Sequence, residues 1–317
     1  MKKTKRDISI LALGDAVDYD SYQKLNHEKR SFLKYGFNYH TTGYRQFLDD
    51  KAPRIKTEKL IIFLFFPFSY WDKHIEHKDY RGIYGNRTFY KKFSDFWGKV
   101  ERKVKKHYGD KKIFSINDLF LSAAYRDKIT VVKELAKFNI PQPKLHKASG
   151  VKNIFHKLES GHRFFLKPRY GSMGKGITYL SLYEWETNFN FRNNRIISRI
   201  SDHGWKFRDI TGNQKFLRQL LSKDIFIQGA VDSPIIHGNK LDFRVYTFLN
   251  KAIYVYPRRN SIDKVTTNIS QGGCGDPRLL KLLPKKLIDN AKREAERVSR
   301  SLNINLGGID IIPDRNL

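Results

Sequence analysis

A lysine and a cluster of glycines lie side by side in the segment 164–177, FFLKPRYGSMGKGI. The apolar residues before Lys167 predict a short strand over 162–166, and Pro168 is expected to end it. The glycines of the following loop are Gly171, Gly174 and Gly176. Glycines let backbone N–H groups turn toward an anion, so a loop of this kind beside a lysine suits a phosphate. An ordinary hairpin turn is the alternative interpretation.

Charged residues interrupt a second predicted strand, 241–249. Alternation places Asp242, Arg244 and Tyr246 on one face and Phe243, Val245 and Thr247 on the other. An arginine pair, Arg258 and Arg259, follows further along the chain. These charges either form ion pairs within the sheet or, beside a phosphate loop, present guanidinium groups to phosphoryl oxygens.

Two more polar residues lie toward the C-terminal end. Asn268 belongs to a second glycine-rich loop, 267–275, which on its own could be a simple turn. Asp310 interrupts the β-branched strand 306–313. A carboxylate there needs a donor or a cation, which a cap, a salt bridge or a Mg²⁺ ion shared with substrate phosphates can supply.

The elements that would carry these residues begin with an α/β alternation. Strands are predicted at 8–13, 60–66 and 111–117, with a helix over 21–35. This pattern predicts an open α/β sheet in a leading domain, 1–118.

Two further parts are predicted, a central α+β subdomain over 119–224 and a C-terminal subdomain over 225–317. Pro141 and Pro143 end a helix over 127–138. The polar and aromatic segment 181–223 is expected to form helices or a long insertion. Further elements are predicted as strands at 224–231, 241–249 and 251–256, a turn at Asn250 and Lys251, and an amphipathic helix within 281–300.

Composition restricts the class of protein. The 317 residues carry a formal net charge of +29, which predicts an anionic partner, with nucleic acid the less favoured candidate. The apolar run 60–66 is too short to cross a bilayer, and no signal segment is evident. Cys274 is the only cysteine, so no internal disulfide can form. We therefore expect a cytoplasmic protein.

The order of these motifs resembles the ATP-grasp superfamily, and within it the glutathione synthetase and ribosomal-protein-glutamate-ligase branch. The resemblance covers residues 117–317, about two thirds of the chain. Its motifs are a lysine in RDK, the lysine before GSMGKG, a glutamine-containing strand, DFR, an arginine pair, TTNISQGGCGDPRLL and GIDIIPDR. It implies an ATP-grasp fold behind the leading α/β domain, with ATP and Mg²⁺ as cofactors.

The resemblance also implies roles for individual residues. Lys128 and Lys167 would bind the α- and β-phosphates of ATP. The loop closing over the γ-phosphate would comprise Gly171, Ser172, Met173, Gly174, Lys175 and Gly176. The adenine pocket would be lined by Gln228, Gly229, Ala230 and Val231, with Asp242 near the ribose or the phosphates. Arg244 and Arg258 would contact the transferred phosphoryl group, Asn268 the acceptor and Asp310 the Mg²⁺ ion.

Three departures from the family pattern qualify this picture. Thr266 occupies the position where an arginine usually precedes the TN motif. The substrate signature of glutathione synthetase is absent from the first domain, which argues against glutathione synthesis. The glutamate of a Glu-x-Asn metal motif would fall one residue beyond Leu317, so we expect the sequence to be truncated there.

The predicted activity is an ATP-dependent carboxylate–amine ligase that works through an acyl phosphate, on substrates that the sequence does not name. The positive charge favours an anionic acceptor, and no membrane partner is expected. Two alternatives remain, an ATP-grasp kinase of an anionic small molecule and a non-catalytic binder of polyanions or nucleic acid.

Overall fold

The computed structural model describes residues 7–18, 20–74, 82–147, 150–197 and 205–313. The chain divides into two compact units, one formed by residues 1–80 and 91–124, the other by 81–90 and 125–317. The subdomain limits expected at residues 118 and 224 remain predictions. Among the described residues, no helix has the length and apolar character needed to cross a membrane.

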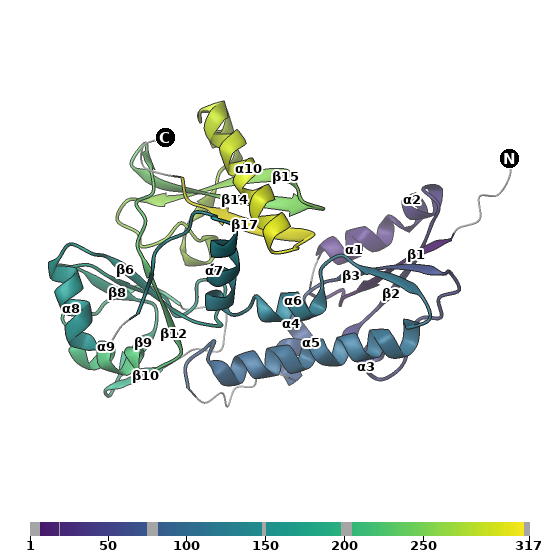
Figure 1. Cartoon of the computed structure of the whole chain (residues 1–317), viewed down its shortest axis with the longest axis horizontal. Coiled ribbons are helices and arrows are strands. Elements are labelled where there is room, and N and C mark those ends of the chain that lie inside the picture. Colours follow the sequence, from purple (N-terminus) through teal and green to yellow (C-terminus); the bar gives the residue numbers. More distant parts are fainter. Residues whose placement is uncertain (1–6, 19, 75–81, 148–149, 198–204, 314–317) are drawn as a thin grey trace. The chain divides into compact units, whose positions relative to one another are not determined.

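The first unit is an open sheet of four parallel strands in the order β2-β1-β3-β4. Helices α1 and α2 cover one face of this sheet, and α3 and α5 lie on the other (Figure 1). The predicted leading α/β sheet is therefore confirmed. The strands are β1 (Ile8–Leu13), β2 (Phe37–Thr42), β3 (Lys59–Leu64) and β4 (Lys112–Ser115). The helices are α1 (Asp20–His27), α2 (Lys29–Lys34), α3 (Tyr44–Leu48), α4 (Phe68–His74), α5 (Arg87–Tyr108) and α6 (Leu119–Ala124).

One sequence prediction for this unit was wrong. The helix expected over 21–35 is two helices, because the backbone of Glu28 leaves the helical conformation (φ −76°, ψ 8°) between α1 and α2. The two helices pack on the same side of the sheet, where Ala12, Tyr22 and Tyr39 form a small core.

The second unit contains a six-stranded antiparallel sheet in the order β11-β8-β7-β6-β12-β5. Its strands are β5 (Leu145–His146), β6 (Phe164–Pro168), β7 (Thr178–Leu180), β8 (Trp185–Thr187), β11 (Arg208–Asp209) and β12 (Ile225–Gly229). A separate hairpin, β9 (Asn190–Arg192) with β10 (Arg195–Ile197), and the helices α7 (Lys128–Lys137), α8 (Val151–Glu159) and α9 (Gln214–Leu221) complete this part. Phe164 and Leu166 are buried, which leaves Phe165 and Lys167 on the opposite face of β6.

Two expectations for this part are corrected. The described part of the segment 181–223 contains β8 to β11 besides α9, and the sequence did not reveal these strands because two or three residues are too few to show a periodic pattern. The strand expected over 162–166 lies over 164–168, and Pro168 ends it as its last residue. Pro168 pairs with Ile225 of β12, whereas the pairing with β7 ends at Leu166, so its missing N–H leaves no ladder hydrogen bond unmade on that side.

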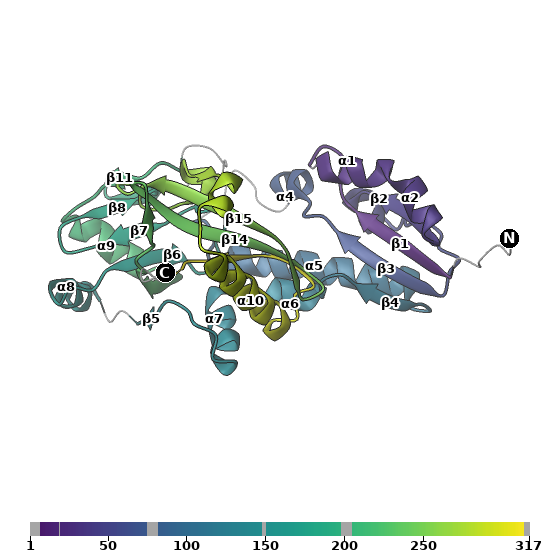
Figure 2. The same ribbon diagram turned by 90° about the horizontal axis from the view of Figure 1, so that it is seen from above.

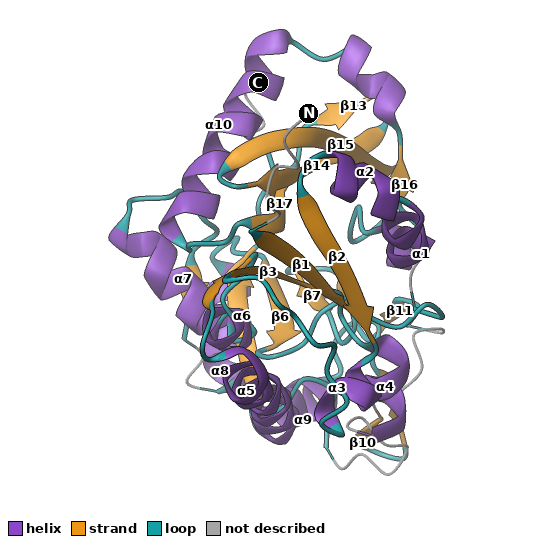
Figure 3. Ribbon diagram, turned by 90° about the vertical axis from the view of Figure 1, so that its right-hand side faces the viewer, coloured by secondary structure: helices purple, strands orange, loops and turns teal. Residues whose placement is uncertain are grey.

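The second unit also contains an antiparallel five-stranded sheet built around β14. Its strands are β13 (Ile235–Ile236), β14 (Asn239–Phe248), β15 (Lys251–Ser261), β16 (Cys274–Gly275) and β17 (Leu306–Ile311). Helix α10 (Lys285–Ser301) lies along this sheet (Figures 2 and 3). Short 3₁₀ turns are η1 (Ile269–Gln271) and η2 (Pro277–Lys281).

Alternation along β14 decides which side chains face α10. Leu241, Phe243 and Val245 form a core with Ala291 and Ala295 of the helix. Asp242 and Arg244 therefore project from the other face, as the alternation predicted.

The turn between β14 and β15 is at Leu249 and Asn250, one residue earlier than expected. Both residues have positive φ angles, 46° and 63°, as a tight hairpin of the twist-matching kind requires.

Candidate functional site

The glycine loop connects β6 to β7 and is fixed at several points. Met173, Gly174 and Gly176 have positive φ angles of 57°, 69° and 73°. Asn188 holds the loop from both sides, since its amide donates to the Gly174 carbonyl (2.7 Å) and its oxygen accepts from the Ile177 N–H (2.7 Å). Two of the three predicted glycines, Gly174 and Gly176, therefore adopt left-handed conformations, whereas Gly171 does not and the non-glycine Met173 does.

The second glycine-rich loop contacts the first. Ser270 Oγ donates to the Met173 carbonyl (3.0 Å), and the Asn268 side chain lies so close to Gly174 that a Cβ there would be 3.1 Å from Asn268 Nδ2. Gln271 adds a hydrogen bond to Asn188 (3.2 Å). The structure therefore brings the predicted residue Asn268 to the predicted glycine loop.

Lys128 is the first residue of α7, which begins at the capping side chain of Asp127. Its ammonium donates to the carbonyls of Pro168 (3.0 Å) and Gly171 at the base of the glycine loop. Burial, with the charges of Arg126 and Lys167, holds the pKa of Lys128 well below its ordinary value. In this structure Lys128 supports the loop backbone, and its contact with phosphate remains a prediction.

Lys167 projects from β6 on the face away from the buried residues of that strand. Its ammonium donates to Gln228 Oε1 on β12 (3.1 Å) and lies 5.3 Å from the centre of the Phe165 ring. Desolvation lowers the pKa of Lys167 from 10.5 to about 8, and the charge of Asp310 opposes this shift. Lys167 and Gln228, assigned to one nucleotide site from the sequence, are thus neighbours, and Asp310 is close enough to act on Lys167.

The residues assigned to the adenine pocket lie at and just after the end of β12, beside a cavity. The Gly229 N–H donates to the Lys144 carbonyl (2.8 Å), and the Ala230 N–H donates to the Arg163 carbonyl (2.8 Å). The cavity has a volume of about 260 Å³ and is lined by Lys144, His146, Gly161, His162, Arg163, Gly229, Ala230 and Val231. Three of the four residues assigned to the adenine pocket therefore line a real hollow.

Two arginines and two aspartates form a network on the face of the C-terminal sheet opposite α10. Asp242 accepts two hydrogen bonds from Arg258 (2.7 and 2.6 Å) across the β14–β15 register. Asp310 accepts two from Arg244 (both 2.9 Å) across the β14–β17 register and lies 3.2 Å from Arg258. The ion pairs weighed as an alternative are present, and they join residues on neighbouring strands.

The network keeps both guanidinium groups charged. The hydrogen bonds with Asp310 raise the pKa of Arg244. Burial alone would lower the pKa of Arg258, but the hydrogen bond with Asp242 and the charges of Asp310 and Asp242 more than offset it. Thr267 also donates to Asp242 (2.6 Å). Sequence reasoning missed Thr267, although its place beside Asn268 in the TTN motif was a usable signal.

The metal assignment for Asp310 remains a prediction. Among the described residues, no three His, Cys, Asp or Glu side chains gather as a metal site. Cys274 is exposed and forms no disulfide.

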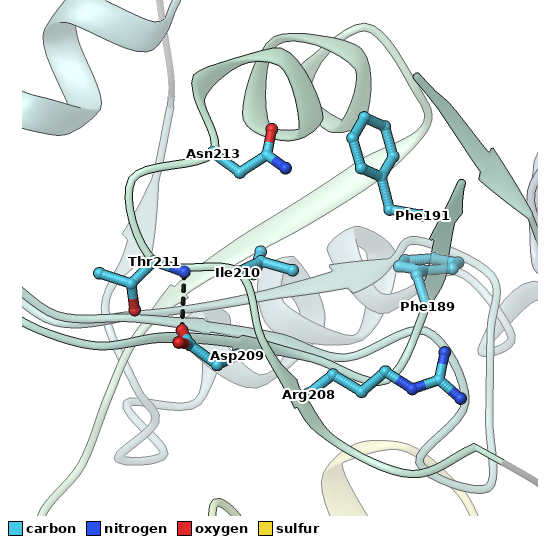
Figure 4. A pocket seen from close by; sticks show the side chains of 7 residues that line it. All are labelled: Phe189, Phe191, Arg208, Asp209, Ile210, Thr211 and Asn213. Carbon is cyan, nitrogen blue, oxygen red and sulfur yellow. Dashed lines mark hydrogen bonds between the residues drawn. The ribbon is translucent and has the colours of Figure 1, made fainter. Parts of the chain in front are cut away.

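A cavity of about 290 Å³ lies elsewhere in the central part of the second unit. It is lined by Phe189, Phe191, Arg208, Asp209, Ile210, Thr211 and Asn213 (Figure 4). Two of its polar groups serve the local fold, since Asn213 caps α9 and Asp209 accepts from the Thr211 N–H (2.8 Å). None of the predicted site residues lines it.

Residues 82–90 supply a part of the site that the sequence did not indicate. The Tyr84 hydroxyl lies 3.0 Å from Ser172 Oγ in the glycine loop. The two residues are 88 positions apart, and no motif links them.

Comparison with solved structures places the whole chain in a known fold. An ATP-grasp ligase, PsnB, complexed with a minimal precursor superposes with a TM-score of 0.54 at 12% identity, covering 98% of this chain and 87% of that one. The Chryseobacterium gregarium RiPP-associated ATP-grasp ligase gives 0.54 at 10% identity (97% and 86%). D-alanine–D-alanine ligase from Bacillus anthracis gives 0.52 at 12% identity (98% and 83%). At such identities these likenesses establish the fold alone.

No curated protein matches the sequence. A family model described as YheC/D-like ATP-grasp matches residues 117–316, which is more than half of the chain and includes the glycine loop and the arginine–aspartate network. The ATP-grasp fold predicted from the motifs is confirmed, and the chain belongs to the YheC/D-like ATP-grasp family.

Proposed function

We propose that this protein is a ligase that uses ATP and Mg²⁺ to join a carboxylate to an amine. The observation that carries the proposal is the group of cationic side chains around Asp310 on the C-terminal sheet. Arg244 donates two hydrogen bonds to the Asp310 carboxylate, Arg258 lies 3.2 Å from it, and its charge acts on the pKa of Lys167 on the central sheet. One ammonium and two guanidinium groups around one region suit a phosphoryl group during transfer.

ATP and Mg²⁺ are the cofactors of ATP-grasp ligases. The residues present fit both. The glycine loop and the Lys167 ammonium would hold phosphates. Lys167 suits this role because it is desolvated and the charge of Asp310 offsets that loss only in part. The cavity lined by Gly229, Ala230 and Val231 would accept the adenine. Asp310 would hold Mg²⁺, because its carboxylate already binds cationic groups and its side chain is 47% exposed. When bound, the ion would neutralise phosphate oxygens.

The proposed reaction has two steps. A carboxylate oxygen of the substrate attacks the γ-phosphorus, which forms an acyl phosphate and releases ADP. The amine nitrogen then attacks the acyl carbon, phosphate leaves and the nitrogen loses its proton. No bond to the protein forms, so Lys167, Arg244 and Arg258 would act by binding and orienting the phosphoryl group, while the two glycine loops exclude water.

The charge of the chain supports an anionic acceptor. A net charge of +29 attracts polyanions and raises their rate of encounter with the protein. Acidic peptides, which carry several carboxylates, and amino acids, which carry one or two, are therefore the first carboxylate substrates to test.

The experiment measures ADP and inorganic phosphate released from Mg·ATP with a panel of amino acids and acidic peptides, with and without hydroxylamine as a generic amine. The proposal expects phosphate release to require a carboxylate and to yield a hydroxamate, and Lys167→Met to abolish both. ADP release with a stable phosphorylated product and no hydroxamate would instead identify a kinase. A protein that binds acidic peptides but not ATP would be the non-catalytic binder.

A further inference from the structure

Residues 82–90 fit closely against the base of the glycine loop within the second unit. The Tyr170 N–H donates to the Gly85 carbonyl (3.1 Å). Gly85 has a φ of +70°, and a Cβ there would lie 2.5 Å from the backbone nitrogen of Gly171, so a side chain is excluded. This close approach places the Tyr84 hydroxyl 3.0 Å from Ser172 Oγ.

One of the hydrogen bonds at Tyr84 has a fixed direction. Arg126 donates from Nη2 to the Tyr84 hydroxyl (3.2 Å) and from Nε to the Tyr170 carbonyl (2.7 Å). A guanidinium group can only donate, so the Tyr84 oxygen accepts this bond. Either hydroxyl can donate in the pair of Tyr84 and Ser172, and one of the two arrangements has Tyr84 donating to Ser172 Oγ. The hydroxyl proton of Ser172 is then available to an anion at the loop.

The ring of Tyr84 orders a second loop residue. The Lys175 ammonium lies 4.9 Å from the centre of this ring, and the Lys175 side chain is buried. A cation over the face of a tyrosine is attracted by the ring, most strongly where water is excluded. Tyr84 thus contacts two of the six loop residues that the sequence assigned to nucleotide binding, Ser172 through its hydroxyl and Lys175 through its ring.

We propose that Tyr84 is a positioning residue for the nucleotide, which turns the Ser172 hydroxyl proton and the Lys175 ammonium toward the terminal phosphate. The inference rests on the proposed function, since it concerns the same loop. It adds a residue that lies outside the segment matched by the family, 117–316.

The test measures dissociation constants of Mg·AMP-PNP and Mg·ADP by calorimetry for the full chain. The variants are Tyr84→Phe, Ser172→Ala and the double variant. Tyr84→Phe keeps the ring that contacts Lys175 and removes only the hydroxyl. Tyr90→Phe is the matched control, because Tyr90 belongs to the same segment and contacts Tyr170 through a stacked ring (4.5 Å).

Each single variant should weaken Mg·AMP-PNP about fivefold, the factor for one net hydrogen bond, and Mg·ADP less than about twofold. The double variant should be no weaker than the singles, because both changes break one chain of hydrogen bonds. Tyr90→Phe should match the wild type. A variant that fails to fold would bind Mg·AMP-PNP and Mg·ADP more weakly to the same extent. Ser172→Ala changes a half-buried loop position, so it tests the same hydrogen bond without altering Tyr84.

Two results would overturn this inference and leave the proposed function standing. In the first, the wild type binds Mg·AMP-PNP and both single variants bind it equally well. In the second, the double variant binds about 25-fold more weakly than the wild type, which would mean that the two changes act independently. A wild-type chain that binds neither nucleotide would overturn the proposed function, and the role of Tyr84 with it.

Discussion

The titration of Lys167 gives a direct measure of its role. Its pKa is lowered from 10.5 to about 8 by desolvation, so the ammonium is charged at pH 7 and about 90% neutral at pH 9. If the charged form binds phosphate, the dissociation constant of Mg·AMP-PNP should rise about tenfold between pH 7 and pH 9. At pH 8, binding should take up about half a proton, because the phosphate restores the charge.

The assay is calorimetry in two buffers of different ionisation enthalpy, which counts the protons taken up. Lys167→Arg is the matched control, since arginine stays charged throughout this range. Lys128, whose pKa is also lowered, is present in both proteins, so the difference between them isolates Lys167. The reasoning fails if wild-type affinity is flat from pH 7 to 9, or if it falls in parallel with that of Lys167→Arg.

Folding stability should change with the opposite sign. Between about pH 8 and pH 10.5 the unfolded chain binds more protons at Lys167 than the folded chain does. The contribution of this lysine to the free energy of unfolding therefore rises with pH, while affinity for the nucleotide falls. Urea denaturation of the wild type and of Lys167→Met, compared at pH 7.5 and 9.5, separates the two effects.

Three further predictions concern the arginine–aspartate network. Thr267→Val removes a hydrogen bond to the buried Asp242 and should lower the free energy of unfolding by about 2 kcal/mol in urea. Asp242→Asn removes the carboxylate that accepts two hydrogen bonds from Arg258 and leaves only Asp310, 3.2 Å away, so it should cost about 3 kcal/mol, part of which Arg258→Met in the same chain should restore. Asp310→Asn frees Arg244, so at pH 6.5 it should strengthen ADP binding without Mg²⁺ and weaken it with Mg²⁺; a loss in both conditions would contradict this.

Much of the fold could be read from local patterns. The strands at residues 8–13, 60–66 and 241–249 carry apolar runs or clear alternation, and each was found within a few residues of its predicted limits. The short strands between 181 and 223 could not be found in this way, because two or three paired residues leave no period to detect.

The candidate site was predictable where a motif carried it. The DFR and TN motifs led to Asp242, Arg244 and Asn268, which the structure places on or beside the C-terminal sheet. The contacts of Tyr84 with Ser172 and of Asn188 with Gln271 could not be inferred from the sequence, because they depend on the path of the loops in space. The first pair is separated by 88 positions in the chain and the second by 83.

Burial divides the arginine–aspartate network into a fixed part and an exchangeable part. The side chains of Arg258 and Asp242 are 5% and 10% exposed, so separating them would strand a charge in the interior. Those of Arg244 and Asp310 are 38% and 47% exposed, and ion pairs of such exposure contribute little to stability. The four charges of the network cancel, so under the proposed function Arg244 would be free to contact a phosphoryl group only when it separates from Asp310. The exposed pair of Arg244 and Asp310 joins β14 to β17, so it can separate at little cost while the buried pair of Asp242 and Arg258 between β14 and β15 stays in place.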